Sequence, residues 1–595
     1  MTRIDERVST HVYKVKRISK EEMESIAGVC VYDQPPFCNA ACPLKLDVKA
    51  MLKAAAENDF KKAFKIYESI APFPLILSAG CGAPCEEKCR LCELGDGIAI
   101  GDIERAVALS GGAGEKRSIF RVRKKKKAAV FGSGLFALLL AGELEKKGYP
   151  VTAICGEADE EEYLRVAAGF LREDDFYTEL KRLRGKDIAF EFNAEMTREL
   201  FEEKRGGFDV LCASEKAALD IFPGAVRDEG IMLMESEGLL TGGGETVLEA
   251  ALGARKAALT ADRLAQGIDP RSARGEEGPV TSRLYTNPDL ARGLIRIKGC
   301  ESGYTREQAA EEAGRCMQCH CDECLRGCAY LRRFNKHPGL LSREIYNNTQ
   351  IIMGDHPLNR AMNACALCGQ CTVTCPHGFD MAHVCRTARE NMVDTDKMPL
   401  AAHEFALLDM LFSNGEAYLC RKQPGHSHCR YVFFPGCQAA AIAPEAVIAS
   451  YEDLCTRLKG GVALMLGCCG AIAHWAGRGE MYGEVRDKIA AELAALEDPV
   501  IIAGCPSCMK LLSEQDMAET VGIWTVLRDR GLPDGARGGG RAVLHDACGA
   551  RGYPETRSAV RHIMEELGYQ LIEEEYSGDS TQCCGYGGLT AYADR

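Results

Sequence analysis

The residues best suited to chemistry in this chain are five cysteines near its C-terminus. Cys437, the adjacent pair Cys468 and Cys469, and then Cys505 and Cys508 are separated by thirty, no, thirty-five and two residues. Glycine or proline stands beside each short motif and lets the backbone turn tightly there. Adjacent cysteines cannot easily place both thiolates on one cubane, but they can serve a larger, irregular iron–sulfur assembly that needs more than four thiolates. Buried structural cysteines or a zinc site are the alternatives.

This spacing resembles the cysteine-rich CCG domain of heterodisulfide reductase catalytic subunits, with related domains in anaerobic glycerol-3-phosphate dehydrogenase and lactate-utilisation iron–sulfur proteins. The resemblance implies that all five cysteines hold a non-cubane cluster that cleaves a disulfide, and so act as catalytic ligands. We place them in a domain of residues 416–530. The apolar segments 431–434, 462–466 and 500–503 each run into a cysteine loop, which predicts strands whose carboxyl ends carry ligands in an open α/β sheet.

A second copy of the pattern follows in residues 531–595. It contains Cys548, Cys583 and Cys584, and its closing Cys-x2-Cys would lie beyond Arg595. Either the sequence stops early or the missing ligands come from elsewhere. We expect this incomplete repeat not to hold a five-thiolate assembly.

Composition narrows the class of protein. The chain has 31 cysteines in 595 residues, and its charged N-terminus lacks the apolar core of an export signal. No uncharged apolar run is long enough to span a membrane. These features indicate a cytoplasmic protein whose reduced thiols bind metal, and so many cysteines suggest an anaerobe. A net charge of −13 argues against a general nucleic-acid binder.

The first module, residues 1–120, has two cysteine groups joined by a helical stretch. Closely spaced cysteines with glycine and proline between them let a backbone wrap a cubane. The segment resembles the N-terminal two-cluster domain of glutamate synthase small subunits and dihydropyrimidine dehydrogenase, on the motifs Pro36-Phe37-Cys38, Ala41-Cys42-Pro43, Ala83-Pro84-Cys85-Glu86 and residues 100–104. The candidate ligands are Cys30, Cys38, Cys42, Cys81, Cys85, Cys89, Cys92 and Glu104.

The resemblance implies two ligand sets. One is Cys30, Cys38 and Cys89, with Asp33 standing where the family has a cysteine. The other is Cys42, Cys81 and Cys85, completed by Glu104 or by the extra Cys92. One intact cluster beside a degraded one, or zinc, are the alternatives.

The second module, residues 121–275, reads as strand, glycine turn and helix around Gly132, Ser133, Gly134 and Ala137. Such a turn brings backbone N–H groups to a pyrophosphate. It resembles the FAD-binding Rossmann fold of glutamate synthase small subunits, with Gly243, Gly244 and Glu245 in the segment that closes the flavin site. Cys155 replaces the ribose-binding acid, and Glu157 follows two positions on. The family's NAD(P)H domain is missing, so no NAD(P) site is expected. FAD binding and a vestigial scaffold both remain open.

The third module, residues 276–415, contains the bacterial ferredoxin run Cys-x2-Cys-x2-Cys-x3-Cys-Pro. In two-cluster ferredoxins the fourth cysteine ligates the other cluster. We therefore expect one cluster on Cys365, Cys368, Cys371 and Cys328, and another on Cys316, Cys319, Cys324 and Cys375. Cys321 is one cysteine too many, either exchanging with a neighbour or staying a free thiol. The module resembles the helical gamma-type subunit of heterodisulfide reductase.

The sequence thus predicts a multidomain α/β and α protein with a helical two-cluster domain, a Rossmann-like flavin-type fold, a helical dicluster ferredoxin-like domain and α/β CCG domains. It would bind about four cubanes and one non-cubane cluster. The favoured function is a heterodisulfide-reductase-like electron-transfer subunit, an oxidoreductase component working with a flavoprotein, dehydrogenase or ferredoxin and a small disulfide or thiol-type acceptor. A self-contained flavin-dependent oxidoreductase and a non-catalytic electron-conducting adaptor are the alternatives.

Overall fold

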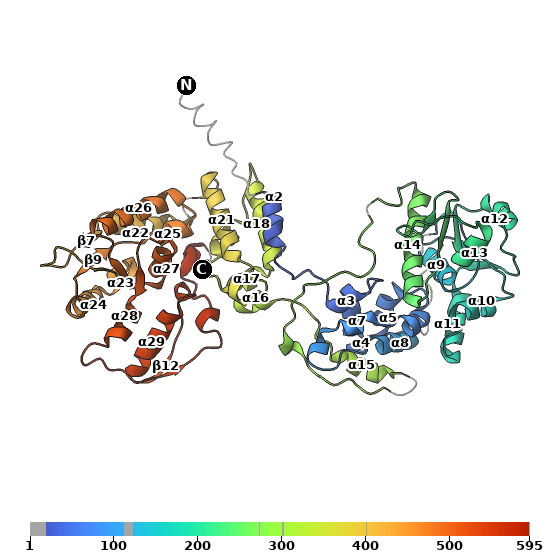
Figure 1. Ribbon diagram of the computed structural model, residues 1–595, viewed down its shortest axis with the longest axis horizontal. Helices are drawn as coiled ribbons and strands as arrows, with labels where there is room; N and C mark the ends of the chain where they lie inside the picture. The colour runs from blue at the N-terminus through green and yellow to red at the C-terminus, as the bar shows by residue number, and fades with distance from the viewer. Residues whose placement is uncertain (1–18, 112–122, 273, 300–302, 400–401, 594–595) are drawn as a thin grey trace, which may run out of the picture. The chain divides into compact units, whose positions relative to one another are not determined.

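The computed structural model describes residues 19–111, 123–272, 274–299, 303–399 and 402–593 (Figure 1). The chain divides into two compact units, one of residues 33–321 and the other of the segment up to Tyr32 together with Asp322 onward. The boundary at 321 falls inside the segment 276–415. The finer division expected from the sequence, at 120, 275, 415 and 530, stays a prediction.

The unit of residues 33–321 begins with a helical module. Asp47 and Asp59 cap two helices by accepting from the backbone N–H groups of Ala50 (3.1 Å) and Lys62 (3.0 Å). Their apolar faces are buried in a common core. The helices are α3 (Phe37–Ala41), α4 (Val48–Ala56), α5 (Phe60–Glu68), α6 (Pro74–Gly80), α7 (Pro84–Glu87), η1 (Arg90–Glu93) and α8 (Ile100–Gly111).

A six-stranded sheet follows, in the order β3-β2-β1-β4-β6-β5, parallel except for the β5–β6 pair. All four residues of the central strand β1 are buried, as expected for a parallel sheet covered on both faces. The strands are β1 (Ala128–Phe131), β2 (Val151–Ile154), β3 (Ile188–Glu191), β4 (Val210–Ser214), β5 (Leu233–Met234) and β6 (Leu239–Gly242), and the helices α9 (Leu135–Lys146), α10 (Glu160–Ala168), α11 (Glu173–Gly185), α12 (Arg198–Arg205), α13 (Glu215–Ile221) and α14 (Val247–Gln266).

The chain then returns to the helical module. After η2 (Pro288–Leu290), the helix α15 (Arg306–Gly314) packs against α4 and α8. Thr305 caps α15, with Gln308 completing a capping box. Residues 304–317 therefore share the core of the first module.

The second unit opens with helices around the ferredoxin-type run. Helix α2 (Lys20–Ala27) packs against α18 (Pro338–Gln350), and α18 packs against α21 (Met381–Asp394). The other helices of this part are α16 (Glu323–Gly327), α17 (Ala329–Phe334), α19 (Asn359–Ala364), α20 (Gln370–Thr374) and α22 (Glu404–Asn414). In the described part of the chain, no helix combines the length and apolarity needed to cross a membrane.

The C-terminal part is a second α/β sheet, in the order β11-β10-β8-β9-β7, parallel except for the β7–β9 pair. Its elements are β7 (Leu419–Arg421), β8 (Tyr431–Phe434), α23 (Cys437–Ile442), α24 (Pro444–Arg457), β9 (Val462–Leu466), α25 (Ala471–Trp475), α26 (Gly479–Ala495), β10 (Val500–Ala503), α27 (Pro506–Glu514), β11 (Thr520–Gly522) and α28 (Ile523–Arg530). Two parallel strands and five helices follow in the described residues: β12 (Gly540–Val543), η4 (Cys548–Ala550), α29 (Pro554–Glu566), β13 (Tyr569–Ile572), η5 (Gly578–Ser580), η6 (Gly587–Leu589) and α30 (Thr590–Ala593). The expectation of a mixed α/β protein with parallel sheets and helical modules is confirmed.

One buried arginine joins the parts of this second unit. The Arg389 side chain is fully buried and donates to four backbone carbonyls, those of Met362 (2.8 Å), Cys365 (2.6 Å), Trp475 (2.7 Å) and Gly588 (2.9 Å). These carbonyls belong to the ferredoxin run, the five-cysteine region and the incomplete repeat. A planar guanidinium with five donors can serve several acceptors at once.

We expect Arg389→Met to loosen these three segments, because their buried carbonyls lose a donor. The free energy of unfolding should fall by about 2–4 kcal/mol. Hydrogen–deuterium exchange should rise at residues 471–475 and 585–593. The matched control is Arg386→Met, one turn earlier on α21, where a partly exposed ion pair with Glu390 is lost and little should change. Equal exchange in the two variants would contradict this role for Arg389.

Candidate metal centres

The five C-terminal cysteines meet at one edge of the second sheet. Cys437 follows β8, Cys468 and Cys469 follow β9, and Cys505 and Cys508 follow β10. Since β8 lies between β9 and β10 and all three are parallel, their carboxyl ends share an edge. The thiols contact one another in the pairs 437–468, 468–469, 469–508 and 505–508.

A glycine is required where this site is tightest. Gly436 has a φ of +88°, and a Cβ there would lie 3.0 Å from the Cβ of Cys505 and 3.3 Å from the Sγ of Cys508. A side chain at this position would both strain the backbone and enter the space between the thiols.

The proton affinities at this site are uneven. Hydrogen bonds from the thiols of Cys468 and Cys508 hold the pKa of Cys469 below its usual range, and the thiol of Cys508 does the same for the pKa of Cys505. The hydrogen bond to Cys468, with burial, raises the pKa of Cys437. A metal centre would draw all five into the thiolate form, because metal ligation requires deprotonated sulfur.

The cysteines of the incomplete repeat lie beside the ferredoxin run. The thiol of Cys583 contacts that of Cys368, and Cys548 lies close to both Cys368 and Cys584. Arg551 strengthens the junction by donating from Nε to the carbonyl of Cys368 at 3.2 Å. The structure thus groups Cys548, Cys583 and Cys584 with a ligand of the expected cubane.

The ferredoxin-type ligands Cys328, Cys365, Cys368 and Cys371 are brought together as the motif suggests. Burial, followed by the neighbouring thiols of this set, raises the pKa of Cys371 to about 12 and that of Cys328 to about 11. Cys385 on α21 is an addition that no spacing pattern signals: it is fully buried and contacts the thiol of Cys365.

In the first module, Cys42, Cys81, Cys85 and Glu104 lie close to one another. Glu104 is only 4% exposed, and burial raises its pKa to about 8 against the opposing hydrogen bond from Tyr67. Burial and the Glu104 carboxylate raise the pKa of Cys81 to about 12. Cys92 is exposed, lies near Cys89 and donates to the carbonyl of Glu86 at 3.4 Å. Of the two suggested fourth ligands, the structure puts Glu104 in this group.

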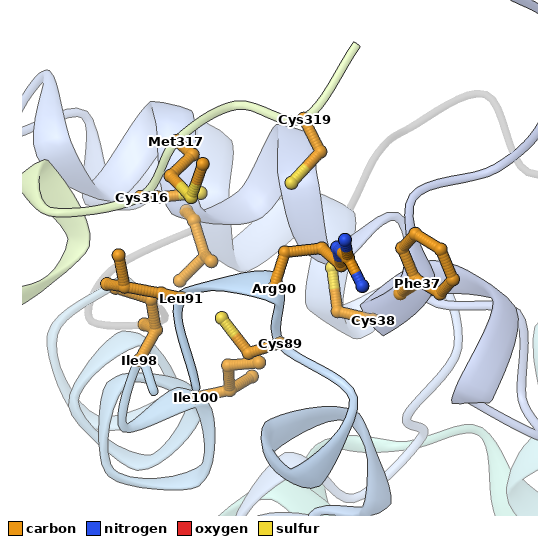
Figure 2. A pocket seen from close by; sticks show the side chains of 11 residues that line it. Phe37, Cys38, Cys89, Arg90, Leu91, Ile98, Ile100, Cys316, Met317 and Cys319 are labelled. Atoms are coloured by element: carbon orange, nitrogen blue, oxygen red, sulfur yellow. The ribbon is translucent and has the colours of Figure 1, made fainter. Parts of the chain in front are cut away.

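Four further cysteines line one cavity in the unit of residues 33–321: Cys38, Cys89, Cys316 and Cys319 (Figure 2). This grouping differs from the one expected, in which Cys316 and Cys319 accompany Cys324 and Cys375. The latter two pack in the core of the other unit, and so does Cys30. Asp33 is exposed, and Cys321 is half-buried.

The flavin-type residues occupy the carboxyl ends of β1, β2 and β6. Gly132 has a φ of +85°, and a Cβ there would lie 2.4 Å from the Oγ of Ser214. Gly134 has a φ of +96° with nothing within 4 Å of the Cβ position, so the N-terminus of α9 is open to a ligand. Ala137 is buried, Ser133 is half-buried, and Gly243, Gly244 and Glu245 follow β6. One carboxylate oxygen of Glu157 is buried without a hydrogen-bond partner.

Within the described ranges, no set of three or more histidine, cysteine, aspartate or glutamate side chains closes on a single metal ion. An iron–sulfur cubane is larger than one ion, and its ligands stand apart around it. The donor set of these groups is almost purely thiol, with one carboxylate in the group of Glu104, and thiolate is the ligand that iron–sulfur clusters use.

Family comparisons agree with the motifs. Residues 7–112 match the family described as dihydropyrimidine dehydrogenase domain II, 4Fe-4S cluster. Residues 315–380 match a 4Fe-4S dicluster domain, and residues 431–513 and 542–595 match a cysteine-rich domain. The chain is therefore an iron–sulfur electron-transfer protein with 4Fe–4S and CCG domains.

Curated relatives match only part of the chain. NADPH-Fe(3+) oxidoreductase subunit beta of Geobacter sulfurreducens is 28% identical over 36% of this chain and 33% of its own length. NADP(+)-dependent formate dehydrogenase subunit beta of Moorella thermoacetica is 28% identical over 22% of this chain and 21% of its own length. Glutamate synthase [NADPH] small chain of Azospirillum brasilense is 29% identical over 23% of this chain and 29% of its own length. The match spans a third or less of each relative's length.

We expect Glu104→Gln to alter the electron paramagnetic resonance signal of one cluster, because the buried carboxylate in the Cys42 group is replaced by a neutral amide. Cys92→Ala should leave every signal unchanged, since Cys92 lies outside this group. Spectra of the anaerobically reduced variants, with iron counts, check both statements. A lost cluster in Cys92→Ala beside an intact spectrum in Glu104→Gln would reverse the assignment.

Proposed function

We propose that this chain is a heterodisulfide-reductase-like subunit of a cytoplasmic redox complex. It would pass electrons through [4Fe–4S] clusters to a cluster on Cys437, Cys468, Cys469, Cys505 and Cys508, and from there to a small disulfide or thiol-type acceptor. The observation that carries the proposal is the convergence of these five thiols at one sheet edge, with Cys437 and Cys505 only half-buried.

A cavity beside this site supports an acceptor of small size. Its volume is about 350 Å³, and its lining includes Cys368, Cys548 and Ser507, which directly precedes Cys508. Arg386 and Lys510 line it together with Asp380 and Glu514. Lys510 pairs with Glu514 at 3.8 Å and Arg386 pairs with Glu390, so the lining is polar and carries charges of both signs. Burial lowers the pKa of His474, another lining residue, to about 4, so its imidazole is neutral near pH 7.

When bound, the clusters would supply one-electron carriers and the point at which electrons leave the chain. The residues of the chain position the ligands. Asn414 accepts from the backbone N–H of Cys468 at 2.9 Å and so fixes the start of the adjacent cysteine pair. Tyr586, which is 62% exposed, lies near Cys437 and Cys505.

A flavin in the unit of residues 33–321 is the second part of the proposal. The open glycine turn before α9 suits a pyrophosphate, and the unpartnered oxygen of Glu157 suits a ribose hydroxyl at the end of β2. An FAD held there would convert between two-electron and one-electron transfer. The names of the curated relatives describe subunits of NADPH- or NADP-dependent enzymes, which supports partner subunits for this chain as well.

Cys469→Ser tests the acceptor-site cluster. The thiol of Cys469 contacts those of both Cys468 and Cys508, so its loss should abolish the resonance signal of the five-cysteine cluster and spare the cubane signals. Cys455→Ser on α24 is the matched control in the same domain, since its thiol contacts Tyr451 and none of the five. An unchanged spectrum in Cys469→Ser would remove the basis of the proposed function.

Gly134→Ala tests the flavin. The added methyl group would occupy the open approach to the helix N-terminus, and we expect the bound flavin per chain to fall at least tenfold. Gly267→Ala is the control, because Gly267 also has a positive φ (+72°) and open space around it but lies at the C-terminal end of α14. Alanine at Gly267, in the left-handed helical region, costs about 1 kcal/mol. Gly134, with φ +96° and ψ 178°, lies in a region almost confined to glycine, so its variant is the more strained, and the flavin contents are compared only after circular dichroism shows that both variants are folded. Equal flavin content in the two variants, or none in the unaltered protein, would refute FAD binding.

A further inference from the structure

The four thiols of Cys38, Cys89, Cys316 and Cys319 come from two distant parts of the sequence. Cys38 lies on α3 and Cys89 between α7 and η1, whereas Cys316 and Cys319 follow α15. Figure 2 shows the four side chains around one space, which is otherwise lined mainly by apolar groups. Each of the two later thiols interacts electrostatically with Cys38 and with Cys89.

A buried carboxylate fixes the later segment onto the earlier one. Glu312 on α15 is completely buried. It accepts from the backbone N–H groups of Ala99 (3.0 Å) and Ile297 (2.9 Å) and pairs with Arg315 at 2.6 Å. Arg315 in turn donates to the carbonyl of Asp96 at 2.6 Å. These bonds hold α15, and hence the residues directly after it, against the helical module.

The two later cysteines are oriented by their own contacts. Lys49 donates from Nζ to the carbonyl of Cys319 at 2.9 Å. The side-chain amide of Gln318 donates to the carbonyl of Lys49 at 3.3 Å and to the Sγ of Cys316 at 3.4 Å. An N–H donor aimed at a sulfur would stabilise a cluster-bound thiolate.

The backbone of this Cys-x2-Cys repeats that of the ferredoxin run. Gln318, directly before Cys319, has a φ of +51°, and Leu367, directly before Cys368, has a φ of +53°. The left-handed region is uncommon for residues other than glycine. Its use at the same position of both motifs indicates the same loop, one that turns both cysteines toward a common centre.

The helical module by itself is two ligands short. Of the four positions that the family resemblance assigns to its first cluster, Cys38, Cys89 and Asp33 lie in this unit. Asp33 is exposed, and Cys30 packs in the core of the other unit, where its Cβ lies 2.9 Å from the Cβ position of Gly339. Cys316 and Cys319 stand where a second pair of thiolates is needed.

We propose that Cys38, Cys89, Cys316 and Cys319 ligate one [4Fe–4S] cluster, which ties the segment after α15 covalently to the N-terminal helical module. The sequence predicted that Cys316 and Cys319 share a cluster with Cys324 and Cys375. In this proposal they belong instead to the cluster of Cys38 and Cys89. Cys324 and Cys375 are left in the unit where Cys30 also lies. This assignment concerns how a cluster is held and does not depend on the acceptor of the proposed function.

Paired substitutions in the full-length, anaerobically reconstituted protein test this assignment. Cys38→Ser/Cys89→Ser and Cys316→Ser/Cys319→Ser should each lose four irons and four sulfides per chain and the same component of the resonance spectrum. The quadruple variant should lose no more than either pair. Cys212→Ala is the control, because Cys212 is buried in β4 and away from these thiols, and its iron content should equal that of the unaltered protein.

The assignment would be overturned if the two pairs removed different components, so that the quadruple variant lost eight irons. Recovery of zinc in place of iron and sulfide at this site would also overturn it. A measurement on the unaltered chain avoids variants that fail to fold: alkylation followed by mass spectrometry during stepwise iron loading. The four cysteines should become protected together, and protection of Cys316 together with Cys324 instead would refute the shared cluster.

Discussion

The crowding of buried thiols is the constraint on which this structure depends. Several cysteines lie within each group. Burial and nearby charges disfavour the thiolate form of many of them, so the pKa rises to about 12 for Cys81 and Cys371 and to about 11 for Cys316. Hydrogen bonds from neighbouring thiols lower the pKa of Cys469 and Cys505 instead. A cationic iron centre reverses this preference. Without metal, only weak hydrogen bonds link the thiols to one another, so the surrounding fold must hold them in place.

Two buried charged residues supply much of that support. Glu312 accepts hydrogen bonds from the backbone N–H groups of Ala99 and Ile297. Arg389 donates to the carbonyls of residues as far apart in the sequence as Met362 and Gly588. Cysteine loops leave many backbone groups without regular partners, and each unpaired group would cost free energy when buried. A carboxylate or guanidinium can satisfy several of these groups at once, which explains why full burial of a charge is tolerated at these two points.

The sequence predicted what local spacing determines. The α/β pattern around residues 431–503 and the run Cys365–Cys371 depend on neighbours within a few residues, or on strands that alternate with helices. The position of Cys316 depends instead on where α15 packs. Helix α15 packs on α4 and α8. Its Glu312 binds the backbone N–H of Ala99, directly before α8, and no periodicity signals the burial of this glutamate. The contact of Cys385 with Cys365 was missed for the same reason, since only the packing of α21 creates it.

The contacts of the incomplete repeat, residues 531–595, indicate its structural role. Its cysteines do not form a second five-thiol edge among the described residues; Cys583 and Cys548 instead lie against Cys368. Arg551 binds the carbonyls of Cys368 and Thr581, and Gly588 accepts from Arg389. The repeat thus contributes Cys548, Gly549 and Gly587 to the lining of the cavity that also includes Cys368 and Ser507. An acceptor bound there would meet residues from all three segments.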